Sequence, residues 1–464
     1  MSTEAADPPA RTPAPVAVVQ EPPVPAQARI DLLCDPGSFH PIRSEAGDGV
    51  ICGAGRVGGR PIYVWSQNVK HKGGSLGQKG GASICSTIAA ADKACAPVVG
   101  FLHSGGARLQ EGVGALGAYA SIFRATSRAN VPQISVICGP CAGGAAYSPS
   151  LGTLVMMVGD GSQMFLTGPR VIAKVTREII SAEDLGGARV HRKTGVSHIE
   201  ADDDAQAADI IRQALSYFPG TLGGPLPSKA PVDPPVGDPS ASVPTNQRKV
   251  YDVRDVARHL LDGGEFLELS RRYAKNMVIG FGHVEGHPVG VIANQPRYLG
   301  GVLDAAASDK GAWFVSMCDR YGIPLIVLSD TPGYRPGVRQ EREAVLRRGA
   351  ALLRAFAVAE VPRVTVTLRQ AYGGAYIVMN CRDLGNDLCL AWPNARIGVM
   401  GAPQAIEIVK RRELEAGADP AALSAAYEDE HLPVAIAASM GYIDEIVEPA
   451  KTRARIAAHF EAHR

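Results

Sequence analysis

Residues 131–147 read VPQISVICGPCAGGAAY, and residues 361–376 read VPRVTVTLRQAYGGAY. Each stretch is a run rich in β-branched residues, typical of a buried strand, that ends in Gly-Gly-Ala. The starting positions (361 minus 131) and the first glycines (373 minus 143) both differ by 230. A strand that leads through glycines into a helix leaves backbone N–H groups unpaired, and such groups bind developing negative charge. We therefore interpret the two turns as paired oxyanion holes.

The same spacing relates the two halves of the chain over most of their length, which indicates an internal duplication. Each half alternates strands and helices, and the segments 98–102 and 325–328 are continuously apolar, as parallel strands buried on both faces are. We predict an α/β fold of two duplicated domains, with sites beyond the carboxyl ends of the strands. The aligned landmarks are Asp35 with Asp262, Gly59 with Gly286 and Ala96 with Ile323, each 227 apart, and Thr167 with Met400, 233 apart.

Composition divides the 464 residues into four segments. Residues 1–28 are dominated by Pro, Ala and Val, and we expect them to be disordered. A second Pro-rich stretch, 220–249, is expected to link an N-terminal domain at 29–219 to a C-terminal domain at 250–464.

Charge and hydropathy argue against several classes of function. A net charge of +1 gives no reason to expect nucleic acid or a membrane surface as a partner. We find no run of about eighteen uncharged apolar residues and no signal peptide, so we expect a cytoplasmic protein. No cluster of His, Cys, Asp or Glu has the spacing of metal ligands, and we expect no metal.

Three short motifs suggest other chemistry, but their contexts argue against it. GAGRVG at 53–58 fits the dinucleotide-binding pattern, yet a strand-like segment follows it, which favours hairpin glycines. Cys138 and Cys141 form a CGPC motif that the second half lacks, so buried thiols are a better interpretation than a redox centre. GGSLG at 73–77 fits the nucleophile elbow, but a polar stretch precedes it. A serine hydrolase that uses Ser75 stays open as the alternative class.

The strongest pattern is a pair of glycine-rich turns in each half. The first half has SGGARLQEG at 104–112 and AGGA at 142–145, and the second has DTPGYRPG at 330–337 and GGA at 373–375. Two backbone donors that converge on one oxygen are what an enolate or a tetrahedral oxyanion requires. No side-chain base accompanies them, which points to a cofactor or cosubstrate as the base. The candidate catalytic residues are Gly105, Gly106, Gly143 and Gly144 in the first half, and Gly333, Gly337, Gly374 and Ala375 in the second.

In these residues the chain resembles the carboxyltransferase (β) subunit of biotin-dependent acyl-CoA carboxylases, which consists of two crotonase-like domains of the ClpP/crotonase superfamily. The resemblance covers about residues 30–464. It rests on the glycine blocks above and on DPGSF at 35–39, LGGA at 185–188, NQP at 294–296, RGA at 348–350 and VMGA at 399–402.

The resemblance implies transfer of a carboxyl group from carboxybiotin, carried on a separate protein, to the α-carbon of a short-chain acyl-CoA. The product would be malonyl-CoA or methylmalonyl-CoA, which are precursors of fatty acids and polyketides; a biotin-dependent acyl-CoA decarboxylase subunit is the alternative. First-half donors would hold the thioester oxygen, and second-half donors would hold the ureido oxygen of biotin. The implied partners are a biotin carboxylase, its biotin carboxyl carrier subunit, and further copies of this chain in a hexamer.

Five further residues are implied to lie near the substrate. In the family the position of Ile377 lies beside the acyl and biotin sites, with Asp common in propionyl-preferring members and an apolar residue in members that accept acetyl-CoA. We therefore expect the chain to use acetyl-CoA and to accept propionyl-CoA. It has no Met-Lys dipeptide, so we expect that it carries no biotin of its own. The substrate-binding residues implied are Ala107, Arg108, Tyr147, Tyr376 and Ile377.

Overall fold

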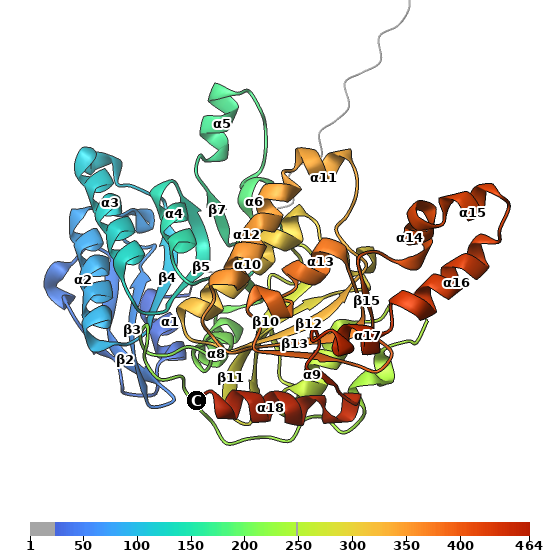
Figure 1. The fold of residues 1–464 in the computed structure, drawn as a ribbon. Coiled ribbons are helices and arrows are strands. Elements are labelled where there is room, and N and C mark those ends of the chain that lie inside the picture. The colour runs from blue at the N-terminus through green and yellow to red at the C-terminus, as the bar shows by residue number, and fades with distance from the viewer. Residues whose placement is uncertain (1–23, 247–248) are drawn as a thin grey trace, which may run out of the picture.

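The computed structural model of the chain describes residues 24–246 and 249–464 (Figure 1). Most of the segment expected to be disordered, 1–28, therefore lies outside the described residues. Helix α1 (Ala26–Leu33) begins three residues before the domain boundary that we expected at 29. Within the described ranges, no helix is both long enough and apolar enough to cross a bilayer.

Strands and helices alternate along both halves of the chain. The strands are β1 (His40–Pro41), β2 (Val50–Val57), β3 (Arg60–Gln67), β4 (Val98–Ser104), β5 (Gln133–Ala142), β6 (Leu154–Val158), β7 (Gln163–Phe165), β8 (Ile199–Ala201), β9 (Leu267–Leu269), β10 (Met277–Val284), β11 (His287–Asn294), β12 (Leu325–Thr331), β13 (Arg363–Tyr372), β14 (Leu388–Ala391), β15 (Arg396–Gly398) and β16 (Glu445–Ile446). The helices after α1 are α2 (Gln78–Ala94), α3 (Val113–Arg128), α4 (Gly144–Leu151), α5 (Pro169–Val175), α6 (Ala182–Gly186), α7 (Ala188–Thr194), α8 (Asp204–Leu215), α9 (Val253–Leu260), α10 (Ala305–Arg320), α11 (Val338–Arg342), α12 (Val345–Val358), α13 (Gly373–Val378), α14 (Ala402–Val409), α15 (Arg411–Glu415), α16 (Pro420–His431), α17 (Val434–Ser439) and α18 (Thr452–Ala462).

Two sheets with equivalent central strands follow one another along the chain. The first has the order β1-β2-β3-β4-β5-β6-β8, and the second has the order β16-β14-β13-β12-β11-β10-β9. In each sheet an antiparallel hairpin, β2–β3 or β10–β11, leads into parallel strands. Figure 1 shows helices packed against both sheets, with α5 and the group α14–α16 projecting from the body. The prediction of two duplicated α/β domains is confirmed.

The glycines of the dinucleotide-like motif lie in the first hairpin. Strands β2 and β3 pair from Val50 with Gln67 to Val57 with Arg60. Gly58 and Gly59 form the turn with φ values of +54° and +75°, which residues with a Cβ rarely adopt. No helix follows this turn directly, so the hairpin interpretation is confirmed.

One hydrophobic cluster contains residues of both domains, and each domain has further clusters of its own. Tyr217 of the first domain stacks on Phe281 of β10 with ring centroids 5.3 Å apart, and Phe218 meets the same ring edge-on at 5.2 Å. His198 stacks on Trp313 of α10 at 4.1 Å, and burial lowers the pKa of His198 to about 4, so this imidazole is neutral at physiological pH. These contacts fix the two domains against each other.

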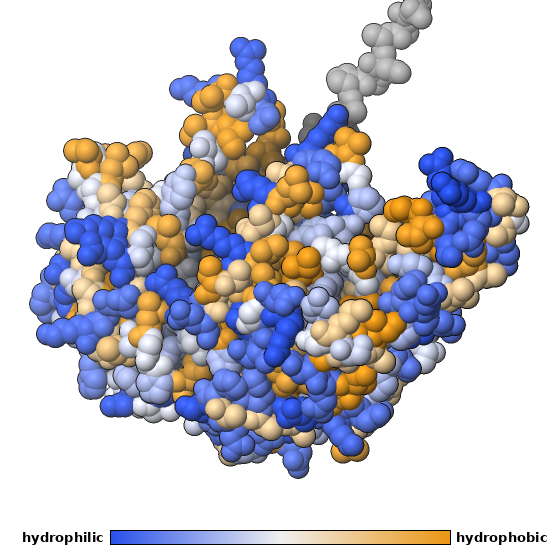
Figure 2. All heavy atoms as spheres, in the orientation of Figure 1, coloured by the Kyte–Doolittle hydropathy of each residue, from blue (hydrophilic) through white to orange (hydrophobic). Residues whose placement is uncertain are grey.

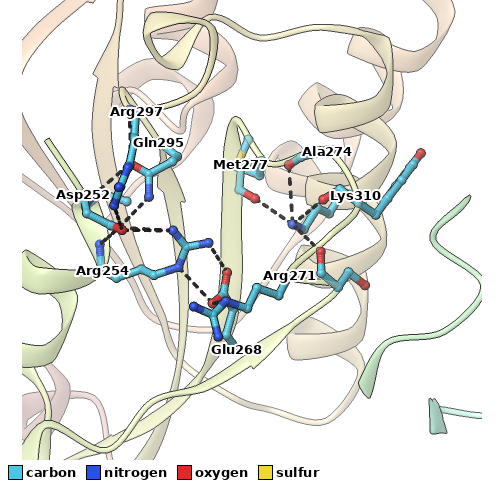
Figure 3. Close-up of polar contacts among 12 residues, drawn as sticks. Asp252, Arg254, Glu268, Arg271, Ala274, Met277, Gln295, Arg297 and Lys310 are labelled. Carbon is cyan, nitrogen blue, oxygen red and sulfur yellow. Dashed lines mark hydrogen bonds and ion pairs between the residues drawn. The ribbon is translucent and has the colours of Figure 1, made fainter. Parts of the chain in front are cut away.

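A buried lysine joins α10 to the loop between β9 and β10 (Figure 3). Lys310 is 3% exposed, and its Nζ donates to the carbonyl oxygens of Ser270, Tyr273, Ala274 and Met277 at 3.0, 2.8, 3.5 and 2.7 Å. The loop holds Ser270 and Ala274 at φ values of +48° and +40°, a costly conformation for residues other than glycine. Burial lowers the pKa of Lys310 to about 7, and in its charged form the ammonium group closes this strained loop in the way that a bound cation would.

Replacement of this ammonium should destabilise the fold. Lys310→Met leaves the four carbonyl groups without their donor, and we expect the free energy of unfolding to fall by about 3–5 kcal/mol. Urea denaturation followed by circular dichroism measures this change. Lys410→Met is the matched control, because its ammonium pairs only with Glu413 on an exposed helix, and we expect a change within about 0.5 kcal/mol. Equal midpoints for the two variants would contradict this role of Lys310.

Candidate functional site

The two glycine turns of each domain lie at the carboxyl ends of adjacent parallel strands. In the first domain, the register of β4 and β5 shifts so that Ser104 pairs with Cys141. In the second domain, β12 and β13 shift at the equivalent place, and Thr331 pairs with Ala371. The structure therefore brings the predicted pairs of turns together in both domains.

In the first domain, the chain itself uses three of the four predicted donors. Their N–H groups are already bonded, so they are not free to bind a substrate oxygen. Gly144, at the first position of α4, donates no hydrogen bond to any described residue, as is usual for a helix start. The occupied donors are Gly105 to the carbonyl of Gly73 at 3.2 Å, Gly106 to Ser104 Oγ at 3.2 Å and Gly143 to the carbonyl of Phe165 at 3.0 Å.

Ala107 supplies a second free N–H group in this turn. It forms a parallel bridge with Leu76, in which Leu76 N–H donates to Gly106 O and Arg108 N–H donates to Leu76 O, both at 2.9 Å. The backbone groups of Ala107 face the opposite edge, and its N–H has no acceptor in the described part of the chain. Of the four predicted glycines, Gly144 therefore keeps a free N–H group, and Ala107 adds a second one. Sequence reasoning had named Ala107 only as a substrate-binding residue.

The second domain repeats this arrangement. Tyr334 bridges Leu303 as Ala107 bridges Leu76, and the offset (334 minus 107) is again 227. Tyr334 N–H and Gly374 N–H donate to no acceptor among residues 24–246 and 249–464. The bonds that set this turn run from Leu303 N–H to Gly333 O at 3.0 Å, from Arg335 N–H to Leu303 O at 2.7 Å and from Gly333 N–H to Thr331 Oγ1 at 3.3 Å.

A cavity of about 1170 Å³ opens at the turns of the second domain. Gly333, Tyr334 and Gly374 line it, whereas Gly337 and Ala375 do not. Residues of the Pro-rich linker form one wall, and the segment that leads into α14 forms another. A cavity of this size fits a small organic ligand whose polar end reaches the two free N–H groups.

The predicted substrate ligand Arg108 is part of a buried ion-pair network instead. It is 3% exposed, and its guanidinium donates to Asp48 at 2.5 Å, to Glu111 at 2.8 Å and to the carbonyl of Ser75 at 2.7 Å. Burial alone would raise the pKa of Asp48, but hydrogen bonds from Arg108 and from Gly80 N–H outweigh it and lower that pKa. The side chain of Arg108 therefore supports the turn and is not available to a substrate.

The other predicted substrate-binding residues follow the second glycine turn of each domain. Tyr147 in α4 is exposed and packs edge-on against Phe123, with ring centroids 6.0 Å apart. Tyr376 in α13 is partly buried, and burial raises the pKa of its hydroxyl. Ile377 is 44% exposed and is not among the residues that line the large cavity. Their contact with a substrate stays a prediction.

Ser75 lacks the setting of a nucleophile. It follows a short 3₁₀ turn, Lys72–Gly74, and its hydroxyl donates to the carbonyl of Lys72 at 2.8 Å. A nucleophile elbow requires a strand that ends in a sharp turn at the serine. This geometry disfavours the serine hydrolase alternative.

The CGPC motif lies inside strand β5 and not at a helix start. Burial raises the pKa of the Cys138 thiol, and it raises the pKa of Cys141 to about 12. Thiolates are the reactive form of cysteine, so both residues have the character of structural thiols. Among the residues that the structure describes, no three His, Cys, Asp or Glu side chains are placed to hold a metal ion.

Comparisons with known proteins agree on one family. The sequence matches the carboxyl transferase domain model over residues 25–464. It is 45% identical over 469 residues to the propionyl-CoA carboxylase beta chain of Saccharopolyspora erythraea, covering 93% of this chain and 86% of the relative. The propionyl-CoA carboxylase carboxyltransferase subunit of Haloferax mediterranei is 44% identical, with coverage of 93% and 89%. A hexameric transcarboxylase 12S structure with methylmalonyl-CoA bound aligns with a TM-score of 0.90 at 40% identity, covering 95% of this chain and 89% of that chain.

The buried CGPC thiols should resist alkylation in the folded protein. We expect iodoacetamide near pH 8 to modify the exposed Cys95 first and to leave Cys138 and Cys141 unmodified, because those two stay protonated. Mass spectrometry of peptides from native and urea-unfolded samples measures the difference. Fast labelling of Cys141 in the native chain, or a reversible Cys138–Cys141 disulfide, would support a redox centre instead.

Proposed function

The chain belongs to the carboxyl transferase domain family, and we propose that it transfers a carboxyl group from carboxybiotin on a carrier protein to the α-carbon of a short-chain acyl-CoA. The observation that carries this proposal is the pair of free N–H groups that each domain presents at equivalent strand ends. Propionyl-CoA carboxylase relatives and a transcarboxylase with methylmalonyl-CoA bound confirm the predicted family.

Each domain would bind a different ligand oxygen through its own pair of donors. Ala107 and Gly144 would hold the thioester oxygen of the acyl-CoA, where negative charge develops when the α-proton leaves. Tyr334 and Gly374 would hold the ureido oxygen of biotin in the cavity of the second domain. Biotin supplies the carboxyl group and the basic site when it is bound. Backbone donors held in place before the reaction stabilise such charge without a side-chain base.

We further propose a hexamer in which the first domain of one chain faces the second domain of another. The acyl and biotin sites lie in different domains, and the related transcarboxylase 12S is a hexamer. Figure 2 shows apolar side chains exposed over α3, α5 and α14, and such patches mark contact surfaces. A biotin carboxylase with its biotin carboxyl carrier subunit would supply carboxybiotin. The exposed residues include Val113 and Leu116 in α3, Val171 and Val175 in α5, and Ile408 and Val409 in α14.

The proposed function predicts that Gly374 matters and Ser75 does not. The assay contains the purified chain, a biotinylated carrier with its carboxylase, bicarbonate, ATP and acyl-CoA, and carboxylated product is measured. A Cβ on Gly374 would find Tyr334 Cδ2 at 3.9 Å as its nearest neighbour, so valine there should enter the cavity without disturbing the fold. We expect Gly374→Val to lower the rate about a hundredfold to a thousandfold.

The control is Ser75→Ala, for which we expect the native rate. Gly144→Val is a less clean test, because its Cβ would lie 2.7 Å from the ring of Tyr119. Loss of turnover in Ser75→Ala together with native turnover in Gly374→Val would refute the carboxyltransferase mechanism in favour of the nucleophile elbow.

The exposed Ile377 predicts which acyl groups the enzyme accepts. We propose that acetyl-CoA and propionyl-CoA are both substrates, and that Ile377→Asp changes their ratio, because one methylene in a small apolar pocket is worth about 1–3 kcal/mol. Rates with acetyl-, propionyl- and butyryl-CoA in the native chain and the variant measure this. If the three rates keep the same ratios in Ile377→Asp, Ile377 does not determine which acyl group the enzyme prefers.

A further inference from the structure

The second domain contains a buried charge cluster beside its cavity. Asp330, at the end of β12, is 0% exposed. Its Oδ2 accepts a hydrogen bond from Tyr251 Oη at 2.8 Å and lies 3.1 Å from Arg369 Nε. The guanidinium of Arg369 lies 5.2 Å from the centre of the Tyr251 ring. The carboxylate of Asp330 in β12 thus contacts both Arg369 in β13 and Tyr251, which lies just after the linker.

Arg369 continues this connection into the linker. Its Nη1 donates to the carbonyl of Lys249 at 2.7 Å and to that of Asn246 at 3.3 Å. Thr245, Asn246 and Val250 line the large cavity together with Arg369. Arg369 thus contacts both this part of the cavity wall and the carboxylate of Asp330.

Asp252, the residue after Tyr251, is hydrogen-bonded to the residue that follows a third strand, β11 (Figure 3). Asp252 accepts a hydrogen bond from Gln295 Nε2 at 2.6 Å, and Gln295 directly follows β11. Figure 3 also shows Arg254 between Asp252 and Glu268, with bonds of 2.6 and 2.9 Å to the Glu268 carboxylate. The chain thus enters the second domain anchored to the ends of β11, β12 and β13.

The first domain shows that the fold does not require this cluster. Its equivalents of Asp330 and Arg369 are His103 and Gly139, by offsets of 227 (330 minus 103) and 230 (369 minus 139). The backbone around them is held in the same way, because Asp330 N–H donates to Asn294 Oδ1 at 3.2 Å and His103 N–H donates to Gln67 Oε1 at 3.2 Å. A Cβ on Gly139 would lie 2.6 Å from the His103 ring, so that ring fills the space and no ion pair forms there.

We propose that Asp330 is a positioning residue for the cavity of the second domain: through Arg369 it holds Asn246 and Lys249, and with them the cavity wall formed by Thr245, Asn246 and Val250. The inference rests on the proposed assignment of this cavity to biotin. It extends that assignment to a segment outside both glycine turns. The linker then has a second role, because its last residues help to align the ureido end of biotin with the two donors.

The protonation of Asp330 agrees with a role other than stability. Burial raises its pKa from 3.8 to about 6, although Arg369, Tyr251 and Gln370 favour the carboxylate. Because the folded pKa lies above the unfolded value, the contribution of Asp330 to stability falls as the pH rises through this window. A buried charge that costs stability at neutral pH is typical of functional sites. The carboxylate that holds Arg369 is present above about pH 6 and is lost below it.

The test measures carboxyl transfer from methylmalonyl-CoA to free biotin, which is the reverse of the proposed reaction, in the native chain, Asp330→Asn and Asp204→Asn. Asp330→Asn removes the negative charge that faces the guanidinium of Arg369, so we expect the KM for biotin to rise roughly tenfold to a hundredfold while the KM for methylmalonyl-CoA stays unchanged. The acid limb of the native pH profile near pH 6 should disappear in this variant. Asp204→Asn breaks the buried ion pair with Arg29 in the first domain, away from the cavity, and both KM values should stay native.

Hydrogen–deuterium exchange separates this inference from the proposed function. We expect faster exchange at residues 245–251 in Asp330→Asn than in the native chain or Asp204→Asn. Tyr251→Phe, which removes one hydrogen bond to Asp330, should change exchange and KM in the same direction by a smaller amount. If the native chain transfers no carboxyl group, the proposed function fails, and exchange alone decides whether Asp330 holds the linker. Native exchange at 245–251 in both variants, or a native KM for biotin in Asp330→Asn, would overturn the inference.

Discussion

Two short parallel β-bridges determine which backbone N–H groups at the strand ends are free to bind a ligand. In the bridges of Leu76 with Ala107 and of Leu303 with Tyr334, the hydrogen bonds come from the residues before and after Ala107 or Tyr334. The N–H groups of Ala107 and Tyr334 themselves stay free. The free group lies at a strand end beside a second glycine turn, where a helix start provides another. Because the donors are backbone atoms, an alanine in one domain and a tyrosine in the other can present the same free N–H group.

The duplication provides the same scaffold twice, but the two copies differ beside the strand ends. The register shift and the bridge are repeated at offsets of 227 to 230, and the equivalent strands follow the same order in both sheets. Only the second copy places Asp330 and Arg369 where the first has His103 and Gly139, and there the linker is part of the cavity wall. Differences between equivalent positions of a duplicated chain therefore show which contacts serve the fold and which serve a site.

The sequence predicted the parts of this account that depend on local pattern. Constant offsets revealed the duplication, continuous apolar runs revealed the parallel strands, and the strand that follows the motif at 53–58 revealed the hairpin glycines. Gly144 and Gly374 were predicted as donors, but the bonds that occupy Gly105 and Gly143 were not predictable, because their acceptors are carbonyls of distant segments. The ion pairs of Arg108 were not predictable for the same reason, since its partner Asp48 lies 60 residues away in the chain.

A crystal structure of the chain with an acyl-CoA and biotin bound tests the central claim most directly. The account predicts the thioester oxygen within about 3 Å of the N–H groups of Ala107 and Gly144, and the ureido oxygen at the same distance from those of Tyr334 and Gly374. It also predicts that the two ligands face each other across two chains. Biotin bound away from the second-domain turns, or a thioester oxygen held by side chains alone, would contradict it.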